Sequence, residues 1–363
     1  MMRDVTSTTI DLIDGSGRRA VPASWLRMHC PCAACMLVDI GERRVMVTSP
    51  TEWDVASVGH DDGCTTVTWA SGHVSTYDAG FAALMDAKAN RRRWSPVHWG
   101  GDHVVAEIGH DRFMNDPQAR LDALLRYRAE GVLVLRGVPT TGTPSEDFLD
   151  AIRIPIWEGP FGLRSIDTRV QAVAYNVAET AEALPPHSDL AGYQWPPSGQ
   201  MLHMLVNEAE GGDSLVVDGW RILTEFRADA PEMFQVLTEV PVAHRIYDET
   251  RETWARAPLV RLDAHGEING FRFSNQTLQP LPLDEPRIDE WYRAYTELAA
   301  RLSAPDQAAT FRLETGDAYL THAHRVLHAR TAFSARGDRC IRDVYFEFDN
   351  VLAELDRLTG DNP

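Results

Sequence analysis

Residues 185–189 read Pro-Pro-His-Ser-Asp, and this short stretch decides how the rest of the chain is interpreted. In an extended strand, side chains two residues apart point to the same face. His187 and Asp189 would therefore present an imidazole and a carboxylate to one metal ion. A His-x-Asp pair arises often by chance, so it indicates a metal site only if another part of the chain supplies a further ligand.

Residues 316–330, GDAYLTHAHRVLHAR, offer that ligand because they contain His322, His324 and His328. A His-x-Asp pair followed far downstream by a histidine is the order required by a two-histidine, one-carboxylate facial triad. Such a triad occupies one face of octahedral Fe(II) and leaves positions for a co-substrate and dioxygen. Arg339 follows in a strand-like segment, and its forked guanidinium suits the far end of a dicarboxylate.

Short β-rich runs surround these residues, and few helices interrupt them. The predicted strands are 10–13, 20–25, 45–47, 65–69, 73–77, 132–135, 170–173, 201–206, 215–217, 271–273, 318–321 and 343–348. The predicted helices run over about 78–90, 117–130 and 287–302. Many short strands with only two or three convincing helices favour a mainly β protein, an antiparallel sandwich or barrel with flanking helices, over a doubly wound sheet.

The composition limits the classes of partner. The 363 residues are 44% hydrophobic, which suffices for a full core and suggests two domains. The formal charge of -18 disfavours nucleic acid and anionic membranes as partners, and Lys88 is the only lysine. No apolar run has the length of a signal peptide or a bilayer span, so we expect a cytoplasmic protein. We place the domain boundary after residue 97.

Three of the five cysteines crowd together at Cys30, Cys32 and Cys35. An odd number of cysteines does not suit a disulfide framework, and this spacing is more natural for a metal clamp. Cys64 and Cys340 are interpreted as ordinary thiols.

From about residue 159 to 349 the chain resembles the γ-butyrobetaine hydroxylase and trimethyllysine hydroxylase group of the taurine-dioxygenase-like superfamily of Fe(II), 2-oxoglutarate-dependent oxygenases. The motifs that carry the resemblance are Asn176-Val177-Ala178, His187-Ser188-Asp189, Pro196-Pro197, Gln200-Met201-Leu202-His203, Gly211-Gly212-Asp213-Ser214, Asp218-Gly219, Asn275, Gly316-Asp317, Arg325-Val326-Leu327-His328 and Arg339. The resemblance implies a double-stranded β-helix, or jelly roll, over residues 98–363, and a homodimer.

The resemblance also implies the roles of individual residues. It makes His187, Asp189 and His328 the iron ligands, Arg339 the anchor for the 2-oxoglutarate carboxylate, and Ser214 a helper beside it. The two histidines just before His328 are then not ligands. The expected reaction is hydroxylation of an unactivated C–H bond of a small molecule by dioxygen, with succinate and CO2 as co-products.

Residues 1–97 resemble the small zinc domain of the same group. In that domain a Cys-x-Cys-x-x-Cys motif follows a Trp-Leu-Arg segment and is joined by a later histidine. Here these are residues 25–27, then Cys30, Cys32 and Cys35, then His73. Three thiolates and an imidazole make a closed tetrahedral set, so the resemblance implies a structural Zn(II) without a catalytic position.

The match departs from the γ-butyrobetaine enzymes at two positions where they carry aromatic residues that surround a quaternary ammonium group. These positions hold Glu179 and Leu190. A carboxylate pairs better with an amine, which donates hydrogen bonds, than with a trimethylammonium group, which cannot. We therefore expect a small amine-bearing or zwitterionic substrate. Its expected binding residues are Asn176, Glu179, Tyr193 and Asn275.

Other functions stay open. Tyr175, Tyr193 and Trp195 could rebuild part of an aromatic cage, which keeps γ-butyrobetaine or a related quaternary ammonium as an alternative substrate. The same oxidant could also be diverted to desaturation, cyclisation or bond cleavage. Halogenation is disfavoured because Asp189 is present. A non-catalytic zinc-bearing scaffold is disfavoured because the iron ligands and Arg339 are all intact.

Overall fold

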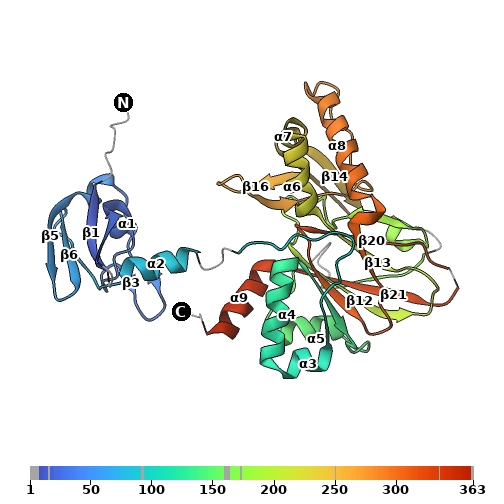
Figure 1. Ribbon diagram of the computed structural model, residues 1–363, viewed down its shortest axis with the longest axis horizontal. Helices are drawn as coiled ribbons and strands as arrows, with labels where there is room; N and C mark the ends of the chain where they lie inside the picture. The colour runs from blue at the N-terminus through green and yellow to red at the C-terminus, as the bar shows by residue number, and fades with distance from the viewer. Residues whose placement is uncertain are drawn as a thin grey trace. The chain divides into compact units, whose positions relative to one another are not determined.

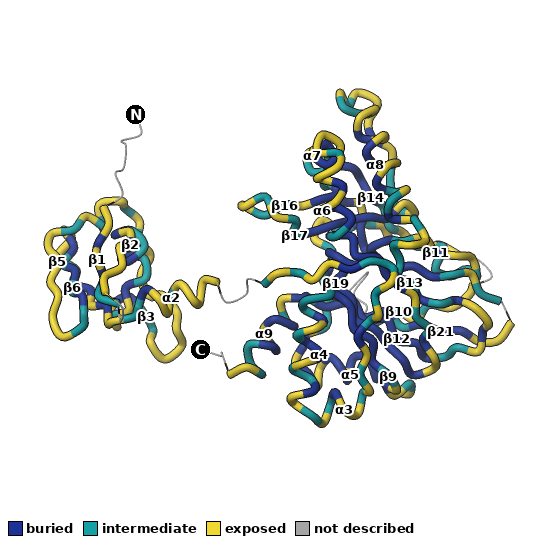
Figure 2. The backbone as a smooth tube through the Cα atoms, viewed as in Figure 1, coloured by how far each residue is buried: buried dark blue, intermediate teal, exposed yellow. Residues whose placement is uncertain are grey.

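The computed structural model divides the chain into two compact units, residues 1–93 and 94–363. It describes residues 8–14, 17–90, 94–158, 164–171, 174–249, 251–334 and 336–360. Each unit has a hydrophobic core of its own, which appears as the buried segments in Figure 2. Trp94 belongs to the second unit, where its ring lies near those of Trp220 and Phe348.

The first unit is built from short strands and two helices (Figure 1). Its elements are β1 (Thr9–Asp14), β2 (Gly17–Pro22), α1 (Ala23–Met28), β3 (Met36–Leu37), β4 (Glu42–Arg43), η1 (Pro50–Trp53), β5 (Val55–Asp61), β6 (Cys64–Trp69), β7 (Val74–Tyr77) and α2 (Phe81–Asn90). β1 and β2 form a hairpin, and β5, β6 and β7 form an antiparallel sheet. Leu12, Leu26 and Trp69 are fully buried between these layers, and Lys88 is exposed on α2.

Two sheets form the centre of the second unit. The larger has the strand order β10-β21-β12-β19-β9-β8, and the smaller has the order β11-β20-β13-β18. The bounds are β8 (Glu107–Gly109), β9 (Val132–Arg136), β10 (Ile166–Thr168), β11 (Leu184–His187), β12 (Gly199–Asn207), β13 (Ser214–Asp218), β18 (Ala308–Phe311), β19 (Ala318–His322), β20 (Val326–Arg330) and β21 (Arg339–Phe346). All neighbours pair antiparallel except β8 and β9.

The inner faces of the two sheets pack on each other. Met204 and Tyr319 from the larger sheet join Val216 and Ala309 from the smaller one in a single buried cluster. Two facing antiparallel sheets closed in this way make the expected jelly roll, and the predicted fold class is confirmed.

Helices cover the outer face of the larger sheet (Figure 1). They are α3 (His110–Asn115), α4 (Pro117–Glu130), α5 (Pro144–Ala151) and α9 (Phe348–Thr359). α4 begins where the Asp116 carboxylate accepts hydrogen bonds from the amides of Gln118 and Ala119, and it ends at Gly131, whose φ is 81°. Its Leu124 and Tyr127 are completely buried in the cluster that also includes Leu320 of β19.

A long insertion separates β13 from β18. It contains α6 (Gly219–Asp229), α7 (Pro231–Glu239), β14 (Val242–Tyr247), β15 (Glu252–Ala257), β16 (Val260–Leu262), β17 (Ile268–Phe271), α8 (Ile288–Leu302) and η4 (Pro305–Gln307). α8 follows the predicted helical spacing, with Trp291, Leu298 and Leu302 buried along one face. The insertion therefore has a core of its own beside the smaller sheet.

The structure corrects several local predictions. Trp25 lies in α1 rather than in a strand, and residues 45–47 form no strand. Phe348 begins α9 instead of ending β21, and β17 stops at Phe271. Residues 170–171 form no strand, and residues 172–173 lie outside the described residues. The prediction of only two or three helices was wrong, because the insertion and the flanks of the larger sheet contain more.

No helix in the described ranges combines the length and apolar character needed to cross a membrane.

Candidate active site

His187, Asp189 and His328 come together at the edge of the smaller sheet. His187 ends β11 directly opposite His328 of β20, and the two rings lie 4.2 Å apart. Asp189 follows two residues later, and its Oδ1 lies 3.2 Å from His187 Nε2 and 3.7 Å from His328 Nε2. One ligand atom from each of the three residues lies within 4.8 Å of the others. This donor set could hold a single metal ion, and two imidazoles with one carboxylate suit Fe(II).

The histidines are prepared as ligands by their surroundings. His187 Nδ1 lies 3.0 Å from the Pro185 carbonyl oxygen, which can only accept, so Nδ1 carries the proton and Nε2 is left free. Burial, and after it the neighbouring His187, lower the pKa of His328 to about 3. A neutral imidazole is the form that binds a metal.

The far side of the Asp189 carboxylate is fixed by two donors. Its Oδ2 accepts hydrogen bonds from Gln200 Nε2 at 2.7 Å and from the Tyr345 hydroxyl at 2.9 Å. The same Gln200 amide donates to Asp343 Oδ1 at 3.0 Å. Burial, followed by the proximity of Asp189, raises the pKa of Asp343 well above its usual range.

A small cavity extends from the three ligands into the space between the sheets. Arg339, Arg330, Ser214 and Tyr319 line it together with the ligands. Arg339 is 8% exposed, and no carboxylate in the described ranges lies within ion-pair distance of its guanidinium. Its Nε is buried without a hydrogen-bond partner there. A buried cation without a counter-charge is costly, so this cavity is suited to an anion.

Arg330 and Arg339 are placed by the same aromatic ring. The two guanidinium carbons lie 4.7 Å and 4.8 Å from the centre of the Phe333 ring. Arg330 differs from Arg339 because its terminal nitrogens donate to the carbonyl oxygens of Ala178, Thr180 and Glu182. Arg330 therefore holds a loop, whereas Arg339 keeps its donors for the cavity.

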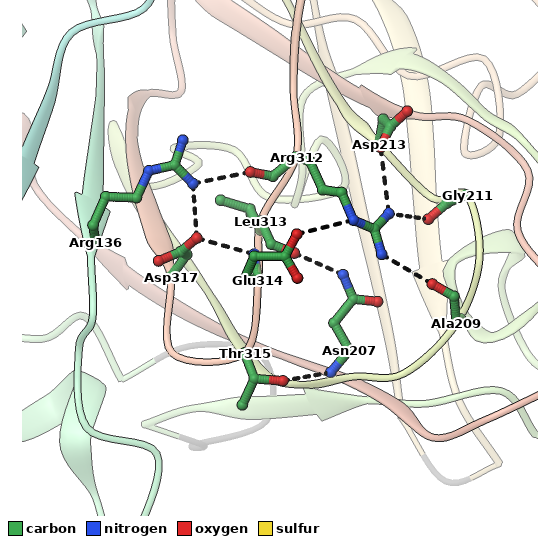
Figure 3. A network of polar contacts seen from close by, with 10 residues as sticks. All are labelled: Arg136, Asn207, Ala209, Gly211, Asp213, Arg312, Leu313, Glu314, Thr315 and Asp317. Carbon is green, nitrogen blue, oxygen red and sulfur yellow. Dashed lines mark hydrogen bonds and ion pairs between the residues drawn. The ribbon is translucent and has the colours of Figure 1, made fainter.

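A polar network around Arg312 holds the turn of residues 209–213 (Figure 3). Arg312 donates to the carbonyl oxygens of Ala209 and Gly211 and lies 3.4 Å from Asp213. Gly212, between Gly211 and Asp213, has φ 74°, and a Cβ there would lie 3.3 Å from Arg339 Nε. The network thus fixes a turn whose close approach to Arg339 requires glycine.

The other end of the network joins β9 to the start of β19. Arg136 donates to the Asp317 carboxylate at 2.7 Å and to the Arg312 carbonyl oxygen at 2.9 Å. Asp317 also accepts from the amide of Glu314, which closes the turn that leads into the strand of Tyr319. Gly316 and Asp317 therefore stabilise the turn that leads into β19, and neither residue lines the cavity.

The four predicted substrate-binding residues lie outside the lining of the Arg339 cavity. Asn176 is exposed, and Asn275 is exposed with its Oδ1 accepting from the Tyr295 hydroxyl. The Glu179 carboxylate accepts from the backbone amide of Tyr175 at 2.7 Å. Tyr193 packs edge-to-face on Trp157, with ring centres 5.3 Å apart.

Of the proposed cage residues, only Tyr193 joins an aromatic group near the triad. Trp157 lies edge-to-face with both Tyr193 and Tyr345, and the Tyr345 hydroxyl is the one that contacts Asp189. Tyr175 is exposed and donates to Glu249, and Trp195 is 70% exposed beneath the guanidinium of Arg261.

Several residues of the site were missed from the sequence. Gln200 was quoted only as part of a motif, and Trp157, Asp343 and Tyr345 were not singled out. The alternation of a strand was a usable signal, because Asp343 and Tyr345 lie at even spacing from Arg339 on β21. Trp157 follows from no pattern, since it contacts Tyr345 from outside the strands.

His322 and His324 lie outside the metal-ligand group. The His322 ring stacks on Phe348 at 4.1 Å, and His324 Nε2 lies 2.9 Å from the Pro196 carbonyl oxygen.

A second candidate metal centre lies in the first unit. The Sγ atoms of Cys30, Cys32 and Cys35 lie 3.3, 3.8 and 3.5 Å from His73 Nε2. The ligand atoms of all four residues lie within 4.8 Å of one another. Four soft donors at this spacing could hold zinc in a closed tetrahedral site. Cys64 and Cys340 lie elsewhere as free thiols, and His29 Nδ1 pairs with the Trp25 carbonyl.

Comparison with known proteins agrees with this geometry. The model of the Taurine catabolism dioxygenase TauD, TfdA family matches residues 101–345, and the model Gamma-butyrobetaine hydroxylase-like, N-terminal, matches residues 4–81. The gamma-butyrobetaine dioxygenase of Pseudomonas sp. (strain AK-1) is 35% identical over 91% of this chain and 88% of the relative. The mitochondrial trimethyllysine dioxygenase of Bos taurus is 26% identical over 93% of this chain and 82% of the relative.

Among solved structures, an asparagine oxygenase in complex with Fe(II), 2S,3S-3-hydroxyasparagine and succinate has a TM-score of 0.50. It is 18% identical to this chain, and the match covers 64% of this chain and 80% of that one. This likeness concerns the fold, and it supports the jelly-roll architecture. The resemblance inferred from the motifs is confirmed by the family models and the bacterial relative, and the chain is a dioxygenase that belongs to the TauD, TfdA family.

Proposed function

We propose that the second unit is an Fe(II)- and 2-oxoglutarate-dependent hydroxylase whose iron ligands are His187, Asp189 and His328. The observation that carries this proposal is one cavity in which the three ligand side chains and the buried, uncompensated Arg339 meet. When bound, iron and 2-oxoglutarate supply the oxidising chemistry that turns dioxygen and a substrate C–H bond into a hydroxylated product, succinate and CO2.

The chain's own groups bind and orient the reactants. Arg339 forms a charge-assisted fork with the distal carboxylate of 2-oxoglutarate, and Ser214 and Tyr319 line the same space. Gln200 and Tyr345 hold Asp189 in one rotamer, so its Oδ1 faces the two imidazoles. Burial of the cavity between two sheets excludes water from the reacting groups.

Replacing Arg339 by Gln tests the assignment. We expect the KM for 2-oxoglutarate to rise by at least about tenfold, because a charge-assisted pair is lost. Succinate formation measured against 2-oxoglutarate concentration checks this, with the exposed Arg336→Gln variant as the matched control. Equal KM values in the two variants would contradict the role of Arg339. Wild-type protein that gives no 2-oxoglutarate-dependent absorption band with Fe(II) under anaerobic conditions would contradict the proposed function itself.

For the substrate, we propose a small amine-bearing or zwitterionic metabolite whose cationic nitrogen lies against Trp157, Tyr193 and Tyr345. Aromatic faces attract cations, and this group stands beside Asp189. A quaternary ammonium is the second candidate. One observation favours it: the same aromatic group of Trp157, Tyr193 and Tyr345 attracts a cation without needing hydrogen bonds from it.

A panel of small amines, amino acids and betaines, scored by substrate-dependent succinate formation, separates the two candidates. If the substrate is an amine held by Glu179, then Glu179→Gln raises the KM of the best amine and leaves that of γ-butyrobetaine unchanged. Turnover of γ-butyrobetaine as fast as that of the best amine would sink the amine preference. Product analysis in the same assay separates hydroxylation from desaturation, cyclisation or cleavage.

We also propose that Cys30, Cys32, Cys35 and His73 bind a structural Zn(II), which makes the first unit, residues 1–93, a zinc-binding domain ahead of the oxygenase unit, residues 94–363. The protein is further proposed to act as a homodimer in the cytoplasm. The zinc site rests on the closed set of four donors. Sedimentation equilibrium tests the dimer, and a mass equal to that of one chain would contradict it.

A further inference from the structure

A second, larger cavity lies in the unit of residues 94–363. Its volume is about 410 Å³, and it is lined by the loop that follows Asp189 and by β16, β17 and the end of α7. It shares one lining residue, Asp189, with the cavity that contains Arg339. The two cavities therefore adjoin at Asp189, and neither the two histidine ligands nor Arg339 lines the larger one.

The walls of this cavity are mostly apolar. Pro196, Pro258 and Leu262 line it with partly exposed side chains, and Leu259, Val260 and Phe271 are buried behind this surface. A volume of this size with apolar walls is typical of sites for small organic ligands.

Arg261 lies at the rim of the cavity with hydrogen-bonding capacity to spare. Its Nε and one terminal nitrogen each donate to Asn269 at 3.0 Å, which leaves the other terminal nitrogen without a partner in the described structure. The guanidinium lies flat on the backbone of β17, since a Cβ at Gly270 would come within 2.9 Å of Nε. Its carbon stands 6.0 Å from the ring of Trp195, which also lines the cavity.

Arg272 adds a second positive charge from the interior. It is 9% exposed and donates to the carbonyl oxygens of Ala191 and Gln194, each at 2.9 Å. No carboxylate within the described ranges forms an ion pair with Arg261 or Arg272. His324 also lines the cavity, and burial keeps it neutral by lowering its pKa to about 4.

The charge of this cavity is opposite to that of the whole protein. The chain carries a net charge of -18, yet the cavity is lined by two arginines and by one acidic residue, Asp189, whose carboxylate oxygens face the histidines, Gln200 and Tyr345. An exposed guanidinium at the rim, a buried one behind it and a mostly apolar lining match a molecule with one anionic end and an apolar body.

We propose that this cavity is a binding site for a small organic monocarboxylate, separate from the 2-oxoglutarate site. The carboxylate pairs with the terminal nitrogen of Arg261 that has no partner among the described residues, within the positive field of Arg272, and the apolar body lies along Pro196, Pro258 and Leu262. The ligand thereby contacts the loop that follows Asp189.

Hexanoate is a suitable probe because it has one carboxylate and a short apolar chain. Isothermal titration calorimetry of the full-length protein with hexanoate should show binding. Neutral hexanamide should bind at least about tenfold more weakly. Arg261→Gln should weaken hexanoate binding to the same degree. Arg256→Gln, an exposed arginine on neighbouring β15, should leave it unchanged.

The Arg339→Gln variant distinguishes this site from the 2-oxoglutarate site. If the inference is right, hexanoate binds this variant as it binds the wild type. No measurable binding of hexanoate, equal binding of hexanamide, an unaffected Arg261→Gln variant, or loss of binding in Arg339→Gln would each overturn the inference. None of these results depends on turnover, so the inference can fail while the proposed hydroxylase activity stands.

Discussion

Asp189 uses its two carboxylate oxygens for different purposes. Oδ1 faces the two imidazoles, and Oδ2 is held by Gln200 and Tyr345. Hydrogen bonds that orient a metal ligand commonly contribute about 10- to 100-fold to metal affinity. The hydroxyl of Tyr345 therefore belongs to the function of the site even though it makes no contact with the histidines.

Replacing Tyr345 by Phe tests this positioning role. We expect Fe(II) affinity to fall by about tenfold while the fold persists, because one of the two donors to Asp189 is removed and the ring is kept. Anaerobic Fe(II) titration in the presence of 2-oxoglutarate measures the change. Tyr175→Phe is the matched control, since that hydroxyl is exposed and bonds to Glu249. Identical Fe(II) affinities in the two variants would exclude the role of Tyr345.

His244 makes stability depend on pH. It is fully buried on β14, and neither ring nitrogen has a hydrogen-bond partner within the described structure. Burial, followed by the charge of Arg272, lowers its pKa to about 3. The unfolded chain binds a proton near pH 6.5 that the folded chain does not bind, so stability is lost as the pH falls from about 6.5 toward 3.

The loss attributable to His244 at pH 5 is about 2 kcal/mol. His244→Leu, which removes the titrating group at similar volume, should reduce the fall in Tm between pH 7 and pH 5. The exposed His265→Leu should not. An unchanged fall in Tm for His244→Leu would show that other groups cause the acid sensitivity.

Among the elements, α4 shows why some parts of the fold are predictable. A carboxylate cap, a proline in the first turn, helical spacing of leucines and a terminal glycine all indicate the same helix. α6 and α7 show fewer of these signals: Asp218 caps α6, but α6 begins at a glycine, and Pro231 opens α7, but Ala230 before it provides no side-chain cap. Their amphipathic faces are apparent only once the core of the insertion is known.

Gly131 ends α4 under two constraints, and a matched pair of variants separates them. Its φ is 81°, and a Cβ would lie 2.9 Å from Val326 Cγ2. Gly142 has nearly the same φ, 80°, but no atom within 4 Å of the added Cβ. Gly142→Ala should cost about 1 kcal/mol of unfolding free energy from conformation alone, and Gly131→Ala should cost clearly more because it also clashes. Urea denaturation measures both, and equal losses would refute the contribution of the contact.

At the scale of the whole molecule, the sequence predicts those parts of the site that depend on residue type and order. It does not predict the parts that depend on how distant strands and loops pack together. The order of His187, Asp189 and a later histidine indicated a metal site, and the resemblance to the family selected His328 and the proposed role of Arg339. The hydrogen bonds from Gln200 and Tyr345 to the Asp189 carboxylate were not predicted, since they depend on the register of β12 against β21. The cavity beside Arg261 depends on the insertion folding back against residues 190–197, which no local pattern indicates.

The two units have separate cores, so their stabilities should be separable. Cys32→Ser removes one of four ligands, and we expect the protein to lose bound zinc and the unfolding transition of the first unit. The transition of residues 94–363 should persist. Metal analysis and calorimetry check both, with Cys64→Ser as the control because that thiol lies outside the cluster and contacts Asp78. Full zinc content in Cys32→Ser would rule out the site.

The exposed position of Lys88 on α2 has a practical consequence. Residues 94–363 contain no lysine, so amine-reactive dyes, activated biotin esters and amine-coupling chip surfaces have no lysine side chain to modify in the oxygenase unit. The protein can therefore be tethered or tagged through its first unit for single-molecule or surface-based work, with the arginines of both cavities left chemically intact.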